Sequence, residues 1–261
     1  MASHPELLSG NEAIARGAFE AGVTVATGYP GTPSTEILEA FAELSREVTG
    51  IHVEWSPNEK VALEVVVGAS LVGARCIVTM KHVGLNVAAD PLMTFAYVGA
   101  VGGLVVCVAD DPGMHSSQNE QDTRHYARFA KIPILEPSDS QEAKDFTALA
   151  LELSEKFRTP VILRTTTRVS HSRGLAVVGP RQPSVKRIGF VKEPPRYVPI
   201  PLWGRAMRVA VEERLTKLIE AAEQSPVNRI ERREGSLGIV TSSIAYQYVR
   251  EVFPEASVLK L

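Results

Sequence analysis

Glu59 is a carboxylate that the sequence places at the start of a predicted helix. It follows Ser56-Pro57-Asn58, a helix-start signal with a short polar side chain available as a cap. Glu59 therefore falls in the first turn of a helix, where the positive helix end favours a carboxylate, although an ordinary helix-start acid has the same pattern. Gly68 and Ala69 remove side-chain bulk further along. They predict a tightly packed helix that holds the carboxylate at the mouth of a rigid element.

The turn at residues 28–34 (GYPGTPS) is a second candidate site. Its two glycines and two prolines fix an unusual backbone path between a predicted strand and a predicted helix. The N-terminus of that helix presents unpaired N–H groups that suit an anion. A tight turn without a ligand is an equally good interpretation of the spacing.

Two polar segments add histidines and other groups used in acid–base chemistry. His82 lies in residues 81–86 (KHVGLN), and His115 lies in residues 110–122 (DDPGMHSSQNEQD). A lone histidine in such a loop is more often a hydrogen-bonding surface group than a base. The segment 164–173 (RTTTRVSHSR) carries three arginines and suggests an anion site, which a solvated strand exit explains equally well.

Isolated charged residues could also pair as acids and bases. Lys81 with Asp90 is one such combination, and Asp110 with Asp111 is another. Single residues of this kind are a weak signal, so the sequence leaves both pairings open.

The elements that must position these residues alternate between strand and helix. This alternation predicts an α/β fold, with a parallel sheet covered by helices on both faces and ligands bound at the carboxyl ends of the strands. The loops after residues 27, 55, 80 and 109 should therefore share one edge. Ser138 and Gln141 resemble a capping box for the last helix of the unit. Strands are expected at 23–27, 51–55, 76–80, 103–109 and 160–164, and helices at 10–22, 35–44, from 59, at 87–97 and from 138 to 157.

The character of the sequence changes after residue 176. We expect a first domain over 1–176, a proline-rich linker with an amphipathic helix over 177–235, and the start of a second α/β domain over 236–261. One strand-helix-strand unit cannot bury both faces of its own sheet. The second domain is therefore expected to need further polypeptide.

Composition excludes several classes of function. The 28 Lys and Arg residues against 30 Asp and Glu residues give a net charge of −2 without long charge runs, which argues against a nucleic-acid partner. No signal peptide or membrane-spanning stretch is evident, so a cytoplasmic protein with no membrane partner is expected. The two cysteines, Cys76 and Cys107, fall in predicted buried strands and form no Cys-x-x-Cys motif. The chain is therefore not expected to hold an iron-sulfur cluster or structural zinc alone.

Five motifs carry a resemblance to a known family. Together they resemble the N-terminal part of the alpha subunit of indolepyruvate ferredoxin oxidoreductases, which belong to the thiamine diphosphate-dependent 2-oxoacid:ferredoxin oxidoreductases. The resemblance covers most of the chain up to residue 173. The motifs are LSGNEA at 8–13, TGYPGTPSTE at 27–36, NEKVA at 58–62, KHVGLN at 81–86 and DDPGMHSSQNEQD at 110–122.

The resemblance implies a pyrimidine-binding domain in which Glu59 is the catalytic acid. Glu59 would hydrogen-bond the pyrimidine ring nitrogen and favour the tautomer whose exocyclic nitrogen can take the thiazolium proton. The implied reaction is oxidative decarboxylation of indolepyruvate or another aryl pyruvate to an acyl-CoA, with electrons passed to ferredoxin. The resemblance implies cofactor contacts for Pro30, Gly31, Thr32, Glu59, Gly84, Leu85 and Asn86, and substrate contacts for Thr32, His82 and His115.

Other parts of the family's machinery have no match in this sequence. The Gly-Asp-Gly segment and asparagine loop that hold magnesium and diphosphate are missing, as are cluster-binding cysteines. The resemblance thus implies that Mg²⁺ and [4Fe-4S] clusters lie on a partner domain or subunit, in a dimer of heteromers, and that the isolated chain is inactive. The relatives' carboxylate-binding arginine also has no clear counterpart. Two alternatives remain, a non-catalytic regulatory or assembly module and a different thiamine-dependent lyase.

Overall fold

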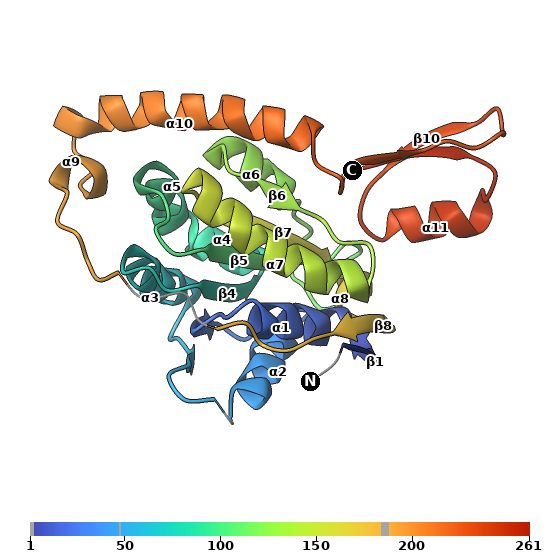
Figure 1. Cartoon of the computed structure of the whole chain (residues 1–261), viewed down its shortest axis with the longest axis horizontal. Coiled ribbons are helices and arrows are strands. Elements are labelled where there is room, and N and C mark those ends of the chain that lie inside the picture. The colour runs from blue at the N-terminus through green and yellow to red at the C-terminus, as the bar shows by residue number, and fades with distance from the viewer. Residues whose placement is uncertain (1–2, 47, 184–187) are drawn as a thin grey trace.

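A six-stranded parallel sheet forms the centre of the chain in the computed structural model, which describes residues 3–46, 48–183 and 188–261 (Figure 1). Every neighbouring pair in this sheet is parallel. The predicted fold class is confirmed, and the ends of the five predicted strands differ from the predicted ones by at most two residues, whereas β6 was not predicted. The strands in spatial order are β3 (His52–Trp55), β2 (Val25–Gly28), β4 (Cys76–Lys81), β5 (Leu104–Asp110), β7 (Val161–Thr166) and β6 (Ile134–Leu135).

Helices cover both faces of this sheet. Alternate residues of a strand point to opposite faces, and in β4 Ile77 joins one apolar cluster while Cys76 and Val78 join the other. Because both faces are covered, β4, β5 and β7 are buried at every position, and each begins with a run of at least three apolar residues. One cluster holds α1 (Gly10–Glu20), α2 (Thr35–Ser45) and α7 (Ser140–Phe157), and the other holds α3 (Glu59–Leu71), α4 (His82–Val87), α5 (Ala89–Val98) and α6 (Arg124–Ala130).

The start of α3 is as predicted, but its packed face is not. Asn58 caps the helix through its side-chain oxygen, which accepts a hydrogen bond from the Val61 amide at 3.0 Å. Ala62 and Val66 are fully buried, so these two residues lie on the packed face. Gly68 is exposed, and a Cβ there would meet nothing within 4 Å. Our expectation that Gly68 allows close packing is therefore wrong.

The predicted capping box of α7 is also wrong. Asp139, rather than Ser138, occupies the cap position, and its carboxylate accepts a hydrogen bond from the Glu142 amide at 2.9 Å. The Ser138 hydroxyl donates instead to the Glu142 carboxylate, and Gln141 donates to Asp145. Asp139 is in the extended conformation that a cap residue needs, so the helix begins one residue later than the pattern indicated.

Several elements were not predicted. Strands β1 (His4–Ser9) and β8 (Arg173–Val178) pair antiparallel in a separate two-stranded sheet. The predicted helix at 87–97 is confirmed as α5, whereas the short helix α4, which begins directly after β4, was not predicted. A short helix, α8 (Thr167–His171), occupies part of the segment predicted to be a strand exit.

A long helix links this body to a small C-terminal unit (Figure 1). The unit's sheet has the order β10-β11-β9, with β10 and β11 parallel, and the buried Lys260 attaches it to α7 through an ion pair with Glu142. Strand β9 falls within the expected linker, of which residues 184–187 lie outside the described residues. The elements are α9 (Pro194–Tyr197), α10 (Pro201–Glu223), β9 (Arg229–Glu231), β10 (Gly238–Thr241), α11 (Ala245–Val252) and β11 (Ser257–Lys260). Within the described part of the chain, no helix is both long and apolar enough to cross a membrane.

Candidate active site

The candidate residues gather at the carboxyl-end edge of the central sheet. Strands β2, β3, β4 and β5 are parallel neighbours, so the loops that follow them lie at the same edge. These loops carry the turn at 28–34, Glu59, residues 81–86 and the segment 110–122. The prediction that one edge collects the polar loops is confirmed.

Glu59 is held in place by the turn that precedes it. The Ser56 amide donates to the Gly28 carbonyl at 2.9 Å, and the Thr27 hydroxyl donates to the Ala62 carbonyl at 2.8 Å, so the start of α3 is tied to β2. Glu59 is only 9% exposed. Among the described residues, its carboxylate makes no hydrogen bond or ion pair. The site therefore contains a nearly buried acid whose carboxylate has no protein partner among the described residues.

Gly84 lies directly against this acid. A Cβ at residue 84 would fall 2.3 Å from Glu59 Oε1 and 2.7 Å from its Cδ, so only glycine fits here without a shift. The neighbouring Leu85 is fully buried. Asn86 is exposed, and its side-chain oxygen accepts a hydrogen bond from the Tyr126 hydroxyl at 2.6 Å. Of the three expected cofactor contacts in this segment, Gly84, Leu85 and Asn86, Gly84 lies directly against Glu59.

The turn that carries Pro30, Gly31 and Thr32 is fixed by its own hydrogen bonds. The Gly31 amide donates to the Thr35 hydroxyl at 2.9 Å, and the Ser34 hydroxyl donates to the Gly31 carbonyl at 2.8 Å. Pro30 and Thr32 are exposed. The turn therefore presents both residues at the edge of the sheet in a defined conformation.

The two candidate histidines occupy different environments. His82 is 1% exposed, and its Nε2 lies 3.1 Å from the Asn119 carbonyl oxygen. Its Nδ1 is buried and has no hydrogen-bond partner among the described residues. His115 is exposed in the loop after β5. His82 is therefore hydrogen-bonded to the loop after β5, whereas His115 lies at the surface.

Asp111 organises the loop after β5. Its carboxylate accepts hydrogen bonds from the Ser116 amide at 2.9 Å, the Ser117 hydroxyl at 2.6 Å and the Thr167 hydroxyl at 2.7 Å. Burial alone would raise the pKa of Asp111, but the hydrogen bonds, that from Ser117 foremost, hold this pKa well below its usual range. Asp111 is thus a charged anchor for the loop.

The predicted acid–base pairs do not form. Asp90 pairs with Lys60 at 2.9 Å, and Lys81 donates instead to the Ser116 carbonyl at 2.8 Å. Asp110 and Asp111 have separate partners, because the Asp110 carboxylate is bound within the protein by Arg164 and Thr123. Each of these groups already has a structural role.

Arg164 is a buried charge that the sequence did not reveal. Its Nε donates to Asp110 at 2.6 Å, and its Nη1 pairs with Glu136. Burial alone would lower the pKa of Arg164, but the charges of Asp110 and Glu136 raise it. The interpretation of a solvated strand exit is wrong at Arg164, because this residue is buried. Its guanidinium is paired with two carboxylates of the protein, those of Asp110 and Glu136. Arg168 and Arg173 are exposed.

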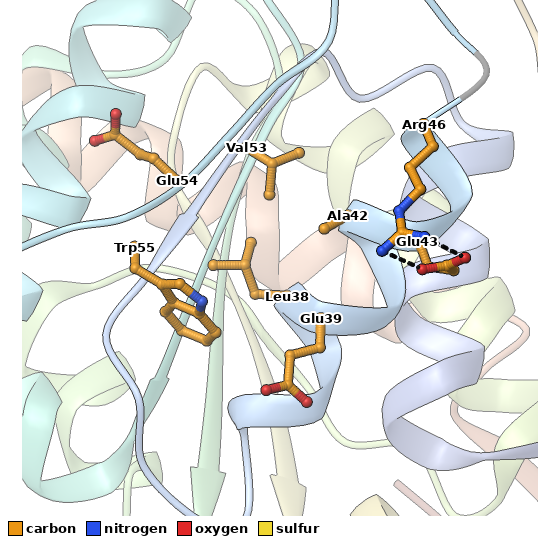
Figure 2. A pocket seen from close by; sticks show the side chains of 8 residues that line it. All are labelled: Leu38, Glu39, Ala42, Glu43, Arg46, Val53, Glu54 and Trp55. Atoms are coloured by element: carbon orange, nitrogen blue, oxygen red, sulfur yellow. Dashed lines mark hydrogen bonds and ion pairs between the residues drawn. The ribbon is translucent and has the colours of Figure 1, made fainter.

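A hollow of about 380 Å³ at the outer edge of the sheet is lined by other residues (Figure 2). It lies between α2 and the edge strand β3, with Leu38 and Trp55 on its walls and an exposed ion pair between Glu43 and Arg46. No group of three or more His, Cys, Asp and Glu side chains in the described ranges could hold a metal ion.

Known proteins resemble this chain in sequence and in fold. The family described as pyruvate flavodoxin/ferredoxin oxidoreductase, thiamine diphosphate-binding, matches residues 16–201. Indolepyruvate oxidoreductase subunit IorA of Archaeoglobus fulgidus is 48% identical over 248 residues, covering 94% of this chain and 40% of that protein. The IorA subunit of Pyrococcus abyssi is 50% identical over 251 residues, covering 94% of this chain and 39% of that protein. The chain thus spans about two fifths of the length of these relatives.

A solved structure shares the fold over nearly the whole chain. The 2-oxoglutarate:ferredoxin oxidoreductase from Magnetococcus marinus, with 2-oxoglutarate, coenzyme A and succinyl-CoA bound, superposes with a TM-score of 0.76. The match covers 98% of this chain and 53% of that chain at 17% identity. At this identity the likeness concerns the fold alone.

Proposed function

Because this chain belongs to the pyruvate flavodoxin/ferredoxin oxidoreductase family of thiamine diphosphate-binding domains, we propose that it holds the aminopyrimidine half of thiamine diphosphate in a 2-oxoacid:ferredoxin oxidoreductase. The observation that carries this proposal is Glu59. The residue is only 9% exposed at a helix start, and its carboxylate has no hydrogen-bond partner among the described residues. The carboxylate is therefore available to a ligand that donates a hydrogen bond to it.

The surroundings of Glu59 fit an aminopyrimidine ring. The missing side chain at Gly84 leaves room for the carboxylate against the backbone of α4. The neighbouring Leu85 is fully buried in the apolar core, and the fixed turn with Pro30 and Gly31 lies on the same edge of the sheet. We propose that these residues, together with Thr32 and Asn86, hold the ring.

The chain's own contribution to catalysis is to position a proton. When bound, thiamine diphosphate supplies a nucleophilic thiazolium carbon and an electron sink for decarboxylation. Glu59 would hold a proton at the ring nitrogen, and the capped start of α3 fixes the position of its carboxylate. The loop that Asp111 anchors is held at this edge by hydrogen bonds to Lys81 at the end of β4 and to His82 at the start of α4.

We propose indolepyruvate or a related aryl pyruvate as the substrate. The relatives that are 48% to 50% identical to this chain are named indolepyruvate oxidoreductase subunits. In the proposed reaction the 2-oxoacid is oxidatively decarboxylated to an acyl-CoA, and ferredoxin receives the electrons. Thr32, His82 and His115 are the proposed substrate contacts.

We propose that the diphosphate-binding, metal-binding and electron-transfer sites lie on a partner domain or subunit. The relatives are more than twice as long as the region that this chain matches. We propose that a partner domain or subunit binds the diphosphate with Mg²⁺ and carries the [4Fe-4S] clusters, in a cytoplasmic dimer of heteromers. In this proposal residues 1–176 form the pyrimidine-binding domain, 177–235 the linker and 236–261 the start of a second domain.

The test replaces Glu59 in the assembled enzyme. We expect Glu59→Gln and Glu59→Ala to lower 2-oxoacid-dependent reduction of ferredoxin by about 10²- to 10⁴-fold, the range for loss of a general acid–base group. Calorimetry would show weaker thiamine diphosphate binding by Glu59→Ala. Glu64→Gln, an exposed acid on the same helix, is the matched control and should keep full activity. Full activity in both Glu59 variants would refute the proposal.

A further inference from the structure

Lys81 is a buried cation without a carboxylate partner. Three Lys and Arg side chains are buried among the residues that the structure describes, namely Lys81, Arg164 and Lys260. The other two are paired, Arg164 with Asp110 and Glu136, and Lys260 with Glu142. Lys81 is 8% exposed, and its one hydrogen bond within the described part of the chain goes to the Ser116 carbonyl at 2.8 Å.

This arrangement leaves the charge of Lys81 uncompensated. A buried ammonium is costly unless a negative group offsets it, and it carries three N–H donors. The Ser116 carbonyl takes one donor and brings no charge. The acids at the end of β5 and in the loop after it are already bound, Asp110 by Arg164 and Thr123, Asp111 by Ser117 and Thr167, Glu120 by the Gly113 amide and Asp122 by Arg124. The other two N–H groups of the Lys81 ammonium have no partner among the described residues, so they can donate to an anionic ligand.

The contacts of Lys81 indicate where that anion would bind. Lys81 is the last residue of β4, on the same edge of the sheet as Glu59. Its side-chain stem runs beside the turn at 28–34, because a Cβ at Gly31 would lie 3.1 Å from Lys81 Cβ. The Ser116 hydroxyl donates to the Thr32 carbonyl at 3.4 Å, so the loop that Lys81 contacts also touches this turn. The ammonium therefore lies between the turn that carries Thr32 and the loop after β5.

We propose that Lys81 binds the carboxylate of the 2-oxoacid substrate. This inference rests on the proposed function, which brings a 2-oxoacid to this edge of the sheet. The ammonium donates a charge-assisted hydrogen bond to the carboxylate, and the Thr32 hydroxyl donates a second one. The carboxylate in turn compensates the buried charge. Lys81 then supplies the positive charge that selects an acid over a neutral carbonyl compound.

The test compares a carboxylate with its neutral isostere. The probes are 3-phenylpropionate and 3-phenylpropionamide, and calorimetry measures their binding to the assembled enzyme loaded with thiamine diphosphate. Lys81→Gln removes the charge and keeps a donor for the Ser116 carbonyl. We expect this variant to bind the carboxylate about 10- to 100-fold more weakly, as for a lost hydrogen bond to a charged group, and the amide unchanged. Lys81→Arg should restore part of the preference.

The control is Lys60→Gln, which removes a partly exposed lysine beside Glu59 that pairs with Asp90. It should keep the preference of the wild-type enzyme for the carboxylate. Thiamine diphosphate should bind Lys81→Gln as it binds the wild type. A weaker affinity for the cofactor with an intact carboxylate preference would mean that Lys81 serves the diphosphate, and it would overturn the inference.

Two further outcomes would also overturn it. Equal weakening of carboxylate and amide binding would mean that Lys81 only supports the loop, and unchanged binding of both would mean that it touches no ligand. Either result, with activity still lost in Glu59→Gln, would remove the inference and leave the proposed function standing. Unfolding in urea checks that Lys81→Gln is folded. If Lys81→Gln is not folded, Lys81→Arg is compared with the wild type. Arginine keeps the positive charge but places it elsewhere, so direct contact predicts a smaller ratio of carboxylate affinity to amide affinity in this variant. A ratio equal to that of the wild type would contradict direct contact.

Discussion

The Glu59 carboxylate lies against the α-carbon of Gly84, where a Cβ would fall 2.3 Å from Oε1 and 2.6 Å from Cγ. Glu59 is the first residue of α3 and Gly84 is the third of α4, so two helix starts meet at this contact. The position of the acid thus depends on a residue with no side chain of its own. It can be shifted without changing Glu59.

Gly84→Ala should displace the carboxylate and lower the activity of the assembled enzyme by about 100-fold, the cost of misplacing a catalytic group by roughly 1 Å. Overpacking should also lower the free energy of unfolding by about 1–3 kcal/mol. Initial rates and urea unfolding measure the two effects. Gly68→Ala is the control, because open space surrounds Gly68 in α3, and it should raise stability by about 0.5–1 kcal/mol and leave the rate unchanged. Equal rates in both variants would show that the Gly84 contact does not position Glu59.

Arg164→Met should destabilise the fold by about 3–5 kcal/mol, because it leaves the buried Asp110 carboxylate without its cation. The free energy of unfolding from urea titration measures this loss. Arg46→Met breaks the exposed pair with Glu43 and should cost less than about 1 kcal/mol. Similar losses in the two variants would contradict the structural role of Arg164.

The sheet and the start of α3 could be predicted because their signals are local. Continuous apolar runs such as that of β5 indicate strands covered on both faces, and Asn58 marks a helix start within four residues of its hydrogen-bond partner. The burial of Arg164 could not be predicted, since its partners Asp110 and Glu136 lie 54 and 28 residues away in the sequence. In the sequence it is one of three arginines at a strand exit.

The same distinction explains the other differences. Strand β1 pairs with β8 from the far end of the domain, so its six residues carry no local sign of their partner. Two short polar residues in succession, Ser138 and Asp139, can both cap a helix, and only the extended backbone of Asp139 decides between them. Gly84 reveals its role only when Glu59, 25 positions earlier in the sequence, is placed against it.

Loop 112–122 should loosen in acid because Asp111 anchors it as a carboxylate. The folded-state pKa of Asp111 lies below its ordinary value of 3.8, since the hydrogen bonds from Ser117, Ser116 and Thr167 outweigh the opposing effect of burial. Its stabilisation is therefore complete above about pH 4 and is lost as pH falls through the folded-state pKa. Hydrogen exchange of the loop should accelerate over this interval. Asp111→Asn should loosen the loop already at neutral pH and remove the acid dependence, whereas an unchanged acid dependence in that variant would assign it to other carboxylates.

Lys260→Met should release the C-terminal unit from α7. Lys260 is fully buried and pairs with Glu142, whose carboxylate also accepts hydrogen bonds from the Ser138 amide and hydroxyl. Burial by itself would raise the pKa of Glu142, but Lys260 and Ser138 lower it, so the pair contributes above the ordinary pKa of 4.5 and is lost as pH falls below the lowered value.

Removing Lys260 leaves a buried carboxylate without its main cation, at a cost of about 3–5 kcal/mol to the contact. Hydrogen exchange of β9, β10 and β11 should rise in Lys260→Met, while that of β4 and β5 stays close to the wild-type value. Lys217→Met, at an exposed lysine of α10, is the control and should leave all five strands unchanged. If exchange rose equally in β5 and β11, the ion pair would stabilise the whole chain and not the docking of its last unit.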